Sequence, residues 1–215
     1  MGRPVLQVLA GVNGAGKSSI GGYLVERAGV TWFNPDTFAR ELAAATGCNP
    51  ETANAAAWAE GIRRLDQAVA GSRNFAFETT LGGETVTARL LAATASHEVR
   101  IWYCGLTSAE LHIARVQARV AAGGHAIPEA KIRERFTRSR VNLLRLMPRL
   151  SHLLVFDNSV EADKAGKIPD PLQVLELDGG RLLYPAVDDL EALRRTPEWA
   201  KPILESALRQ TQSWK

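Results

Sequence analysis

The sequence has few of the residues that mark secreted or membrane proteins. It contains two cysteines, Cys48 and Cys104, too few and too isolated for a disulfide framework or a zinc site, and we expect Cys104 to lie in the core. No uncharged apolar run approaches the length that spans a bilayer, and no signal peptide precedes the apolar run at Val5. Leu6 stands where a myristoylation motif needs Ser or Thr. We therefore expect a cytoplasmic protein.

Length and charge limit the possibilities further. The chain has 215 residues, 46% of them hydrophobic, so we expect one domain with one sizeable core over residues 1–215. The formal net charge is only +3, but residues 110–150 contain nine Arg or Lys against three Glu. This local excess of positive charge suits an anionic ligand.

The most informative segment is residues 11–18, which read G-V-N-G-A-G-K-S and directly follow an apolar run at 5–10. This is the spacing of a phosphate-binding P-loop, in which backbone N–H groups surround a polyphosphate, Lys17 contacts the outer phosphates and Ser18 completes a Mg²⁺ shell. A helix-like stretch at 18–27 gives the strand, loop and helix order that the mechanism needs. The alternative is a glycine turn with a surface lysine. The predicted ATP ligands in this loop are Gly11, Asn13, Gly14, Ala15, Gly16, Lys17, Ser18 and Ser19.

The rest of the chain alternates between strand and helix signals. Short apolar runs at 30–33, 75–77, 99–103 and 153–156 are separated by sequence of helical period. With the run at 5–10, this pattern predicts an α/β fold of the P-loop type, with a parallel five-stranded sheet and helices on both faces. A polar loop at 157–171 precedes a C-terminal appendage of about 172–215, where we expect a hairpin and then helices near 188–194 and 198–209.

Two helices have clear signals. One covers about residues 51–70, with Trp58 and Leu65 on its apolar face, and the other begins at Thr107, which has capping-box spacing to Glu110. The tryptophans at core-like periodicities are interpreted as packing residues rather than base-stacking platforms; they are Trp32, Trp58 and Trp102.

Asp36 is the candidate catalytic base. Pro35 holds Asn34 extended, so Asp36 falls just beyond the carboxyl end of a strand, on the sheet edge that also carries the P-loop. A carboxylate there can accept the proton of an attacking hydroxyl and contact the substrate that carries it. The alternative is that Asp36 only N-caps the following helix.

A second acidic position, Glu78, ends another apolar strand and is followed by Thr79 and Thr80. Glu78 has two candidate roles: the outer shell of Mg²⁺, or, with these threonines, binding of a polar substrate through sugar hydroxyls or amides. The alternative is a solvated strand end. Asn158 follows the last parallel strand and is a candidate for holding the adenine of ATP.

An arginine-rich lid is predicted over about residues 107–145. Its two helices flank a Gly-Gly-His bend, and each carries a pair of arginines one turn apart. An arginine that closes over the transferred phosphoryl group stabilises the charge on its oxygens, whereas the alternative is a solvated basic face. The predicted roles are catalysis for Arg119 and Arg135, together with Lys17, ATP binding for Arg115 and Arg138, and substrate binding for His125.

Together these motifs resemble the zeta toxin family of P-loop kinases over about residues 4–160; they are GVNGAGKS, Asn34-Pro35-Asp36, Glu78-Thr79-Thr80, Gly-Gly-His-x-Ile-Pro and Arg-Phe-x-Arg-Ser. The resemblance implies a nucleoside-kinase type of sheet and ATP-dependent phosphorylation of a sugar hydroxyl on UDP-N-acetylglucosamine, in a toxin–antitoxin setting. On that pattern Lys17 and Ser18 hold ATP and Mg²⁺, Asp36 is the base, and Glu78 with Thr79 holds the amino sugar.

The sequence also departs from that family. Well-known members carry an extended N-terminal segment used with a separate antitoxin, whereas this chain starts at its first strand, and His125 stands where some members have an arginine. We expect a kinase that uses ATP and Mg²⁺ on a sugar nucleotide, with an antitoxin as the candidate protein partner and with neither a membrane nor a nucleic acid as partner. Two alternatives stay open: an ATP-dependent regulatory module with a protein partner, and a polynucleotide end kinase.

Overall fold

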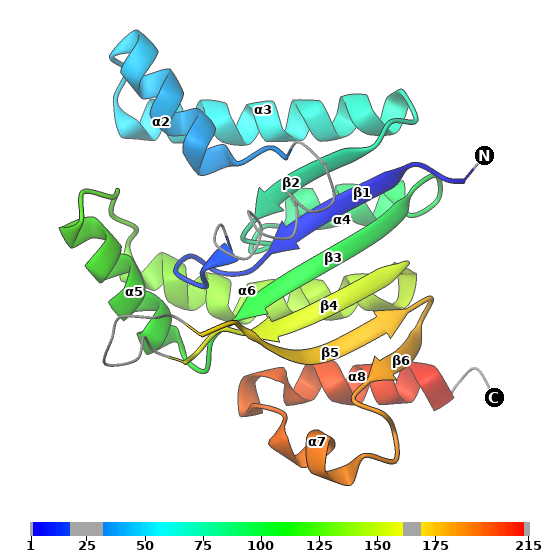
Figure 1. Ribbon diagram of the computed structural model, residues 1–215. Coiled ribbons are helices and arrows are strands. Elements are labelled where there is room, and N and C mark those ends of the chain that lie inside the picture. The colour runs from blue at the N-terminus through cyan, green and yellow to red at the C-terminus, as the bar shows by residue number, and fades with distance from the viewer. Residues whose placement is uncertain (1, 18–31, 161–168, 213–215) are drawn as a thin grey trace.

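A six-stranded sheet organises the chain, with the strand order β2-β1-β3-β4-β5-β6 (Figure 1). The computed structural model describes residues 2–17, 32–160 and 169–212. Strands β1 to β4 are parallel, and β5 and β6 form an antiparallel hairpin that pairs with β4. The strands are β1 (Val5–Ala10), β2 (Phe75–Thr79), β3 (Glu98–Gly105), β4 (His152–Asp157), β5 (Leu172–Asp178) and β6 (Arg181–Tyr184).

The predicted α/β class is confirmed, but two details differ from expectation. The C-terminal hairpin extends the main sheet, because β5 supplies backbone hydrogen-bond partners for the edge of β4 that would otherwise be open. Of the strand expected at 30–33, the described part contains one parallel bridge, from Phe33 to Phe77. The helix expected at 18–27 lies outside the described residues.

The helices lie around this sheet (Figure 1). They are α2 (Pro35–Thr46), α3 (Pro50–Ala70), α4 (Glu84–Ala93), α5 (Ala109–Ala121), α6 (Glu129–Leu146), α7 (Leu190–Arg195) and α8 (Lys201–Gln212), with short 3-10 helices at Met147–Arg149 and Glu198–Ala200. In Figure 1, α4 and α6 pass behind the sheet, α2 and α3 form a pair beside β2, and α8 lies beside β6 with α7 below it. None of the described helices is both long enough and apolar enough to cross a bilayer.

Asn34 starts helix α2. Its side-chain oxygen accepts hydrogen bonds from the backbone N–H groups of Asp36 and Thr37 at 2.9 and 3.2 Å, and Pro35 fills the first helical turn, where no N–H donor is needed. The N-cap is therefore Asn34, and the alternative that Asp36 serves as the cap is wrong. The Asp36 carboxylate remains exposed at the start of the helix.

Helix α3 buries only part of the apolar face that its large side chains indicate, because Leu65 is buried and Trp58 is not. Its buried residues are Ala53, Ala57, Leu65 and Ala68, and Ala53 and Ala57 pack with Ala39 of α2. Trp58 is 55% exposed, so its assignment as a packing residue is wrong. The cause is the alanine contact, since small side chains allow α2 and α3 to approach closely and turn the indole outward.

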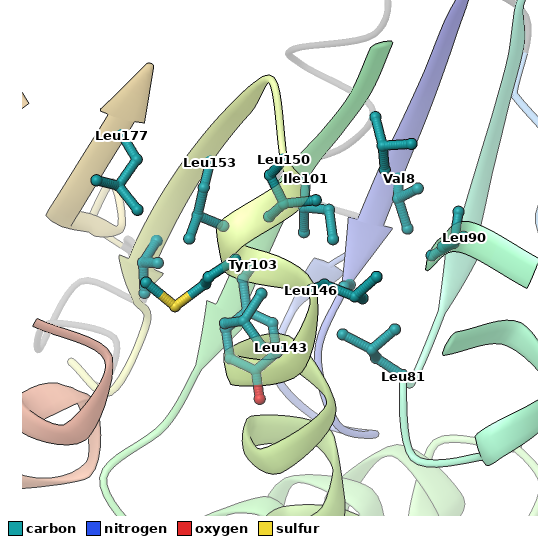
Figure 2. Close-up of a cluster of buried hydrophobic side chains, with 14 of the residues drawn as sticks. Val8, Leu81, Leu90, Ile101, Tyr103, Leu143, Leu146, Leu150, Leu153 and Leu177 are labelled. Atoms are coloured by element: carbon teal, nitrogen blue, oxygen red, sulfur yellow. The ribbon is translucent and has the colours of Figure 1, made fainter. Parts of the chain in front are cut away.

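The two helices of the predicted lid are anchored in separate clusters. Helix α5 is capped by Ser108, which accepts a hydrogen bond from the Leu111 N–H at 3.1 Å, so the expected cap at Thr107 is one residue too early. The N-terminal half of α6 contributes Ile132 to a small cluster, whereas Leu143 and Leu146 near its C-terminal end are fully buried in the main core (Figure 2). The end of the predicted lid segment is thus part of the core.

The main core lies between the parallel strands and the C-terminal half of α6 (Figure 2). Val8, Ile101 and Leu153 from three neighbouring strands are fully buried there. Tyr103 donates a hydrogen bond to Ser139 Oγ of α6 at 3.0 Å, and burial raises the pKa of Tyr103 to about 12. These contacts fix α6 against the sheet, and with it the arginines that α6 carries toward the P-loop.

Candidate active site

The loop after β1 has the backbone geometry of a phosphate cradle. Gly11, Gly14 and Gly16 have φ values of 141°, 81° and 82°, a region that side chains rarely adopt. At Gly16 a Cβ atom would lie 2.3 Å from Asn158 Nδ2, and at Gly11 it would lie 2.1 Å from the Cys104 carbonyl oxygen. Only glycine fits these positions. A loop of this kind turns successive backbone N–H groups toward an anion.

Helix α5 holds the cradle through a residue that sequence reasoning missed. The Nδ1–H of His112 donates to the Asn13 carbonyl oxygen at 2.8 Å, and only 1% of His112 is exposed. Burial lowers the pKa of His112 to about 4, so the imidazole is neutral near pH 7. The sequence signal was its position beside Ile113 and one turn before Val116, on the face that packs against Val12 of the loop.

A buried polar network joins the cradle to β2 and α2. Lys17 Nζ lies 3.3 Å from Glu78 Oε1 and donates to the Val12 carbonyl oxygen at 3.3 Å. The second carboxylate oxygen of Glu78 accepts a hydrogen bond from Asn34 Nδ2 at 3.1 Å. Lys17 and Glu78 are 6% and 8% exposed, so each charge is compensated in a place where an unpaired ion would be costly. The alternative that Glu78 is a solvated strand end is therefore wrong.

Two cavities meet at these residues. The large cavity, of about 360 Å³, extends over α3 and the segment before α6, and the small cavity, of about 230 Å³, lies against the cradle glycines. The side chains that line both are Asn13, Lys17, Asp36 and Glu78. The predicted base and the predicted phosphate ligand therefore lie at one junction.

Arg135 reaches this junction from α6. Its Nη1 donates to Asn13 Oδ1 at 2.7 Å, and its side chain lines the large cavity. Burial lowers the pKa of the Arg135 guanidinium, and the negative charge of Asp36 opposes that shift. A Cβ atom at Gly82 would lie 2.8 Å from Arg135 Cγ. Gly82 therefore leaves the space through which this side chain passes, a role that the sequence did not indicate.

The other predicted lid arginines divide into two groups. Arg115 and Arg119 line the small cavity and donate to the carbonyl oxygens of Val160 and His125, at 3.2 and 3.5 Å. Arg138 lines neither cavity; it pairs with Glu134 at 2.9 Å, and its side chain is 65% exposed. Its position on α6 turns Arg138 to solvent, so the structure gives no support to its predicted role in ATP binding.

Thr79, Thr80 and His125 all line the large cavity, and their role in substrate binding stays a prediction. Asn158 differs from expectation, because its Nδ2 donates to the Ala15 carbonyl oxygen at 2.9 Å; it supports the cradle instead of offering this amide to an adenine ring. Cys104 is buried as predicted, and burial raises the pKa of its thiol to about 12. The predicted ligands Ser18 and Ser19 lie outside the described residues.

Oxygen ligands suited to Mg²⁺ are present at the junction. The carboxylates of Asp36 and Glu78 both line the small cavity, and Mg²⁺ is typically held by one or two carboxylates together with substrate phosphates. Within residues 2–17, 32–160 and 169–212, no group of three or more His, Cys, Asp or Glu side chains is arranged as an all-protein metal site. The residues therefore fit a metal that arrives with a nucleotide.

The match to a known family covers most of this arrangement. Residues 6–140, more than half of the chain, match the model of AAA_33, an AAA domain. The chain belongs to the AAA_33 family. The AAA_33 match includes the cradle, Asp36, Glu78 and Arg135, and it ends within α6.

Three proteins similar to this AAA_33 protein share little of its sequence. An uncharacterized protein of Haemophilus influenzae is 28% identical over 127 residues, which are 59% of this chain and 88% of that protein. The crystal structure of AvrRxo1-ORF1:-ORF2 with ATP has a TM-score of 0.64 at 17% identity, covering 92% of this chain and 64% of that one, so the chain spans less than two thirds of that neighbour. The PezAT toxin-antitoxin system of Streptococcus pneumoniae has a TM-score of 0.56 at 12% identity, covering 99% and 87%.

The AAA_33 match and these structures establish a P-loop kinase-like α/β fold. At identities of 12% to 17% the structural likeness concerns the fold alone. Membership of the zeta toxin family in particular is not established by a similarity of this kind.

Proposed function

We propose that the protein is an ATP-dependent phosphotransferase that transfers the γ-phosphoryl group to a hydroxyl of a sugar nucleotide, with UDP-N-acetylglucosamine as the first acceptor to test. The observation that carries the proposal is the junction of the two cavities, where Lys17 and Asp36 face both the cradle and the larger space. A protein that only binds or hydrolyses ATP has no need for a second cavity with a carboxylate placed where the two cavities meet.

In the proposed reaction, the acceptor oxygen bonds to the γ-phosphorus while the bond from that phosphorus to the β,γ-bridging oxygen breaks, and ADP leaves. The hydroxyl proton passes to the Asp36 carboxylate and from there to water. Lys17 and the cradle hold the phosphates. Arg135 is placed to stabilise the charge that spreads over the transferred group. Ser18 and Glu78 are the proposed contacts that would hold Mg²⁺, which would neutralise phosphate charge.

Support for the acceptor class comes from the large cavity. Its lining combines the Glu78 carboxylate and the threonines at 79 and 80 with basic side chains, which suits a ligand with both hydroxyls and negative charge. Its volume of about 360 Å³ is in the range of small-molecule sites. A polynucleotide end kinase would instead need a basic groove that continues over more of the surface.

Asp36→Asn tests the proposal, with Glu41→Gln as a matched control because Glu41 is exposed on the same helix and lines neither cavity. Each protein is incubated with ATP, Mg²⁺ and a panel of nucleotide sugars and nucleosides, and phosphorylated products are detected by their mass shift. We expect Asp36→Asn to lower the rate of transfer by about 10²- to 10⁴-fold while ATP affinity is kept, and Glu41→Gln to match wild type.

Two results would remove parts of the proposal. Full transfer activity in Asp36→Asn would exclude Asp36 as the base. ATP hydrolysis without transfer to any hydroxyl acceptor would instead favour a regulatory module with a protein partner. The AvrRxo1-ORF1:-ORF2 structure and the PezAT toxin-antitoxin system each involve two different proteins, so a protein partner is the second proposal to test in that case.

A further inference from the structure

The large cavity has an aromatic wall that the proposed reaction does not use. Trp58 lines this cavity from α3 and is 55% exposed. Neither burial in the core nor contact with the transferred phosphate explains it. Large aromatic side chains that remain exposed at a concave site are typical of ligand-binding surfaces, because they offer much apolar area at a small cost in side-chain entropy.

Two of the α3 residues near Trp58 that line the cavity are small. Ala57 and Gly61 of the same helix also line the cavity, and a Cβ atom at Gly61 would lie 3.0 Å from the Phe33 ring. Small side chains therefore bring the backbone of α3 close to the cavity. The indole of Trp58 is the largest side chain that α3 places at the edge of this cavity. Asn54, one turn before Trp58, lines the same wall and offers one acceptor and two donor hydrogens.

Basic groups complete the wall. His125 and Lys131 line the same cavity, and the Lys131 side chain remains 52% exposed although it pairs with Glu134 at 3.2 Å. An indole face, an amide and basic groups within one small-molecule cavity match a planar, hydrogen-bonding ring that carries a phosphate. The phosphate of a bare sugar phosphate would need neither the indole nor the amide.

We infer that Trp58 and Asn54 form a nucleobase subsite, in which the base of a nucleoside phosphate acceptor stacks on the indole and Asn54 hydrogen-bonds its edge. This inference rests on the proposed function, because it treats the large cavity as the acceptor site. It adds the residues that select the acceptor. Trp58 and Asn54 are binding residues and take no part in proton or phosphoryl transfer.

The test measures binding without turnover, by calorimetry on protein saturated with a non-hydrolysable ATP analogue and Mg²⁺. The probes are UMP, CMP and GMP, with ribose 5-phosphate as the probe without a base and N-acetylglucosamine 1-phosphate as the sugar probe. The variants are Trp58→Ala, Trp58→Phe and Asn54→Ala. Val141→Ala is the control, because Val141 is 50% exposed and lines neither cavity. Alanine is a good helix former, so Trp58→Ala should fold.

We expect at least one nucleoside monophosphate to bind wild type more tightly than ribose 5-phosphate does. Trp58→Ala should weaken that binding at least about tenfold, the loss of one base–aromatic stack, while Trp58→Phe stays within about threefold of wild type. Asn54→Ala should reduce the differences among the three nucleotides. Ribose 5-phosphate binding and the Val141→Ala protein should not change.

Equal binding of nucleotides and ribose 5-phosphate, or nucleotide binding that Trp58→Ala leaves intact, would overturn the inference. A loss confined to N-acetylglucosamine 1-phosphate would also overturn it, since the wall would then bind a sugar face. The kinase proposal is judged separately by Asp36→Asn. Trp58-dependent nucleotide binding without phosphate transfer would refute the kinase alone, and transfer that is indifferent to Trp58 would refute the subsite alone.

Discussion

Mild acid should destabilise the protein through His112. This side chain is 1% exposed, and its Nδ1–H donates to the Asn13 carbonyl oxygen of the cradle. Burial is the main cause that lowers its pKa from 6.5 to about 4, and the positive charges of Lys17 and Arg115 act in the same direction. The hydrogen bond to Asn13 acts the other way but is outweighed.

The sign and size of the effect follow from proton linkage. Between pH 6.5 and about 4, His112 is protonated in the unfolded chain and neutral in the folded one, so the unfolded state binds more protons and stability falls as the pH falls. The contribution is complete above pH 6.5 and is lost by about pH 4. The shift of the His112 pKa from 6.5 to about 4 corresponds to about 3 kcal/mol of unfolding free energy, of which about 2 kcal/mol is lost by pH 5.

The assay is urea unfolding at pH values from 7.5 to 4.5 on wild type and His112→Asn. Asparagine keeps an amide N–H near the Nδ1 position but cannot take up a proton. The variant loses the ring contact with Phe136, so its stability at pH 7.5 should be lower, but its decline toward pH 5 should be smaller by about 2 kcal/mol. His125→Asn is the control, because His125 is exposed. Parallel declines in wild type and His112→Asn would refute this reasoning.

Two further substitutions test the site and the core. Arg135→Ala should lower the rate of phosphate transfer by about 10³-fold in steady-state kinetics. The control Arg133→Ala removes an exposed side chain paired with Glu110 and should stay within about threefold of wild type. Similar rates for both variants would exclude an action of Arg135 on the transferred group. Gly105→Ala should lower the unfolding free energy by about 1–3 kcal/mol in urea titrations, because the added Cβ atom would lie 2.3 Å from the Trp199 ring. An unchanged unfolding midpoint would mean that the Trp199 ring moves aside freely.

The features that sequence predicted well have short, fixed spacing. The cradle depends on glycines within eight residues, and the approach of Asp36 to it follows from the rule that parallel strands end at one sheet edge. Lys17, Asp36 and Glu78 accordingly meet at the junction of the cavities. The alternative that Asp36 caps α2 stayed open in the sequence because Asn34 and Asp36 are both good capping residues, and only the backbone geometry distinguishes them.

The features that sequence missed depend on packing between distant segments. His112 contacts Asn13 across 99 positions, and Arg135 contacts it across 122. Local sequence does not name Asn13 as the partner in either contact, since both contacts follow from how α5 and α6 lie on the loop. Trp58 was misplaced for a related reason. Periodicity put Trp58 and Leu65 on the inside of α3; Leu65 is buried, but close packing with α2 selects alanines at the other buried positions near Trp58.

The charges of α5 and α6 explain how a chain with a net charge of only +3 can favour a polyphosphate. Several of their arginines are neutralised by carboxylates at the surface; these pairs are Arg133 with Glu110, Arg138 with Glu134 and Arg145 with Glu84. The arginines at the cavities instead donate to neutral oxygens, those of Val160, His125 and Asn13. Among the described residues, no carboxylate lies within ion-pair distance of these arginines, which are Arg115, Arg119 and Arg135. Their positive charge is therefore concentrated where the cradle opens. There it strengthens the binding of an anion more than the same charge spread evenly over the surface would.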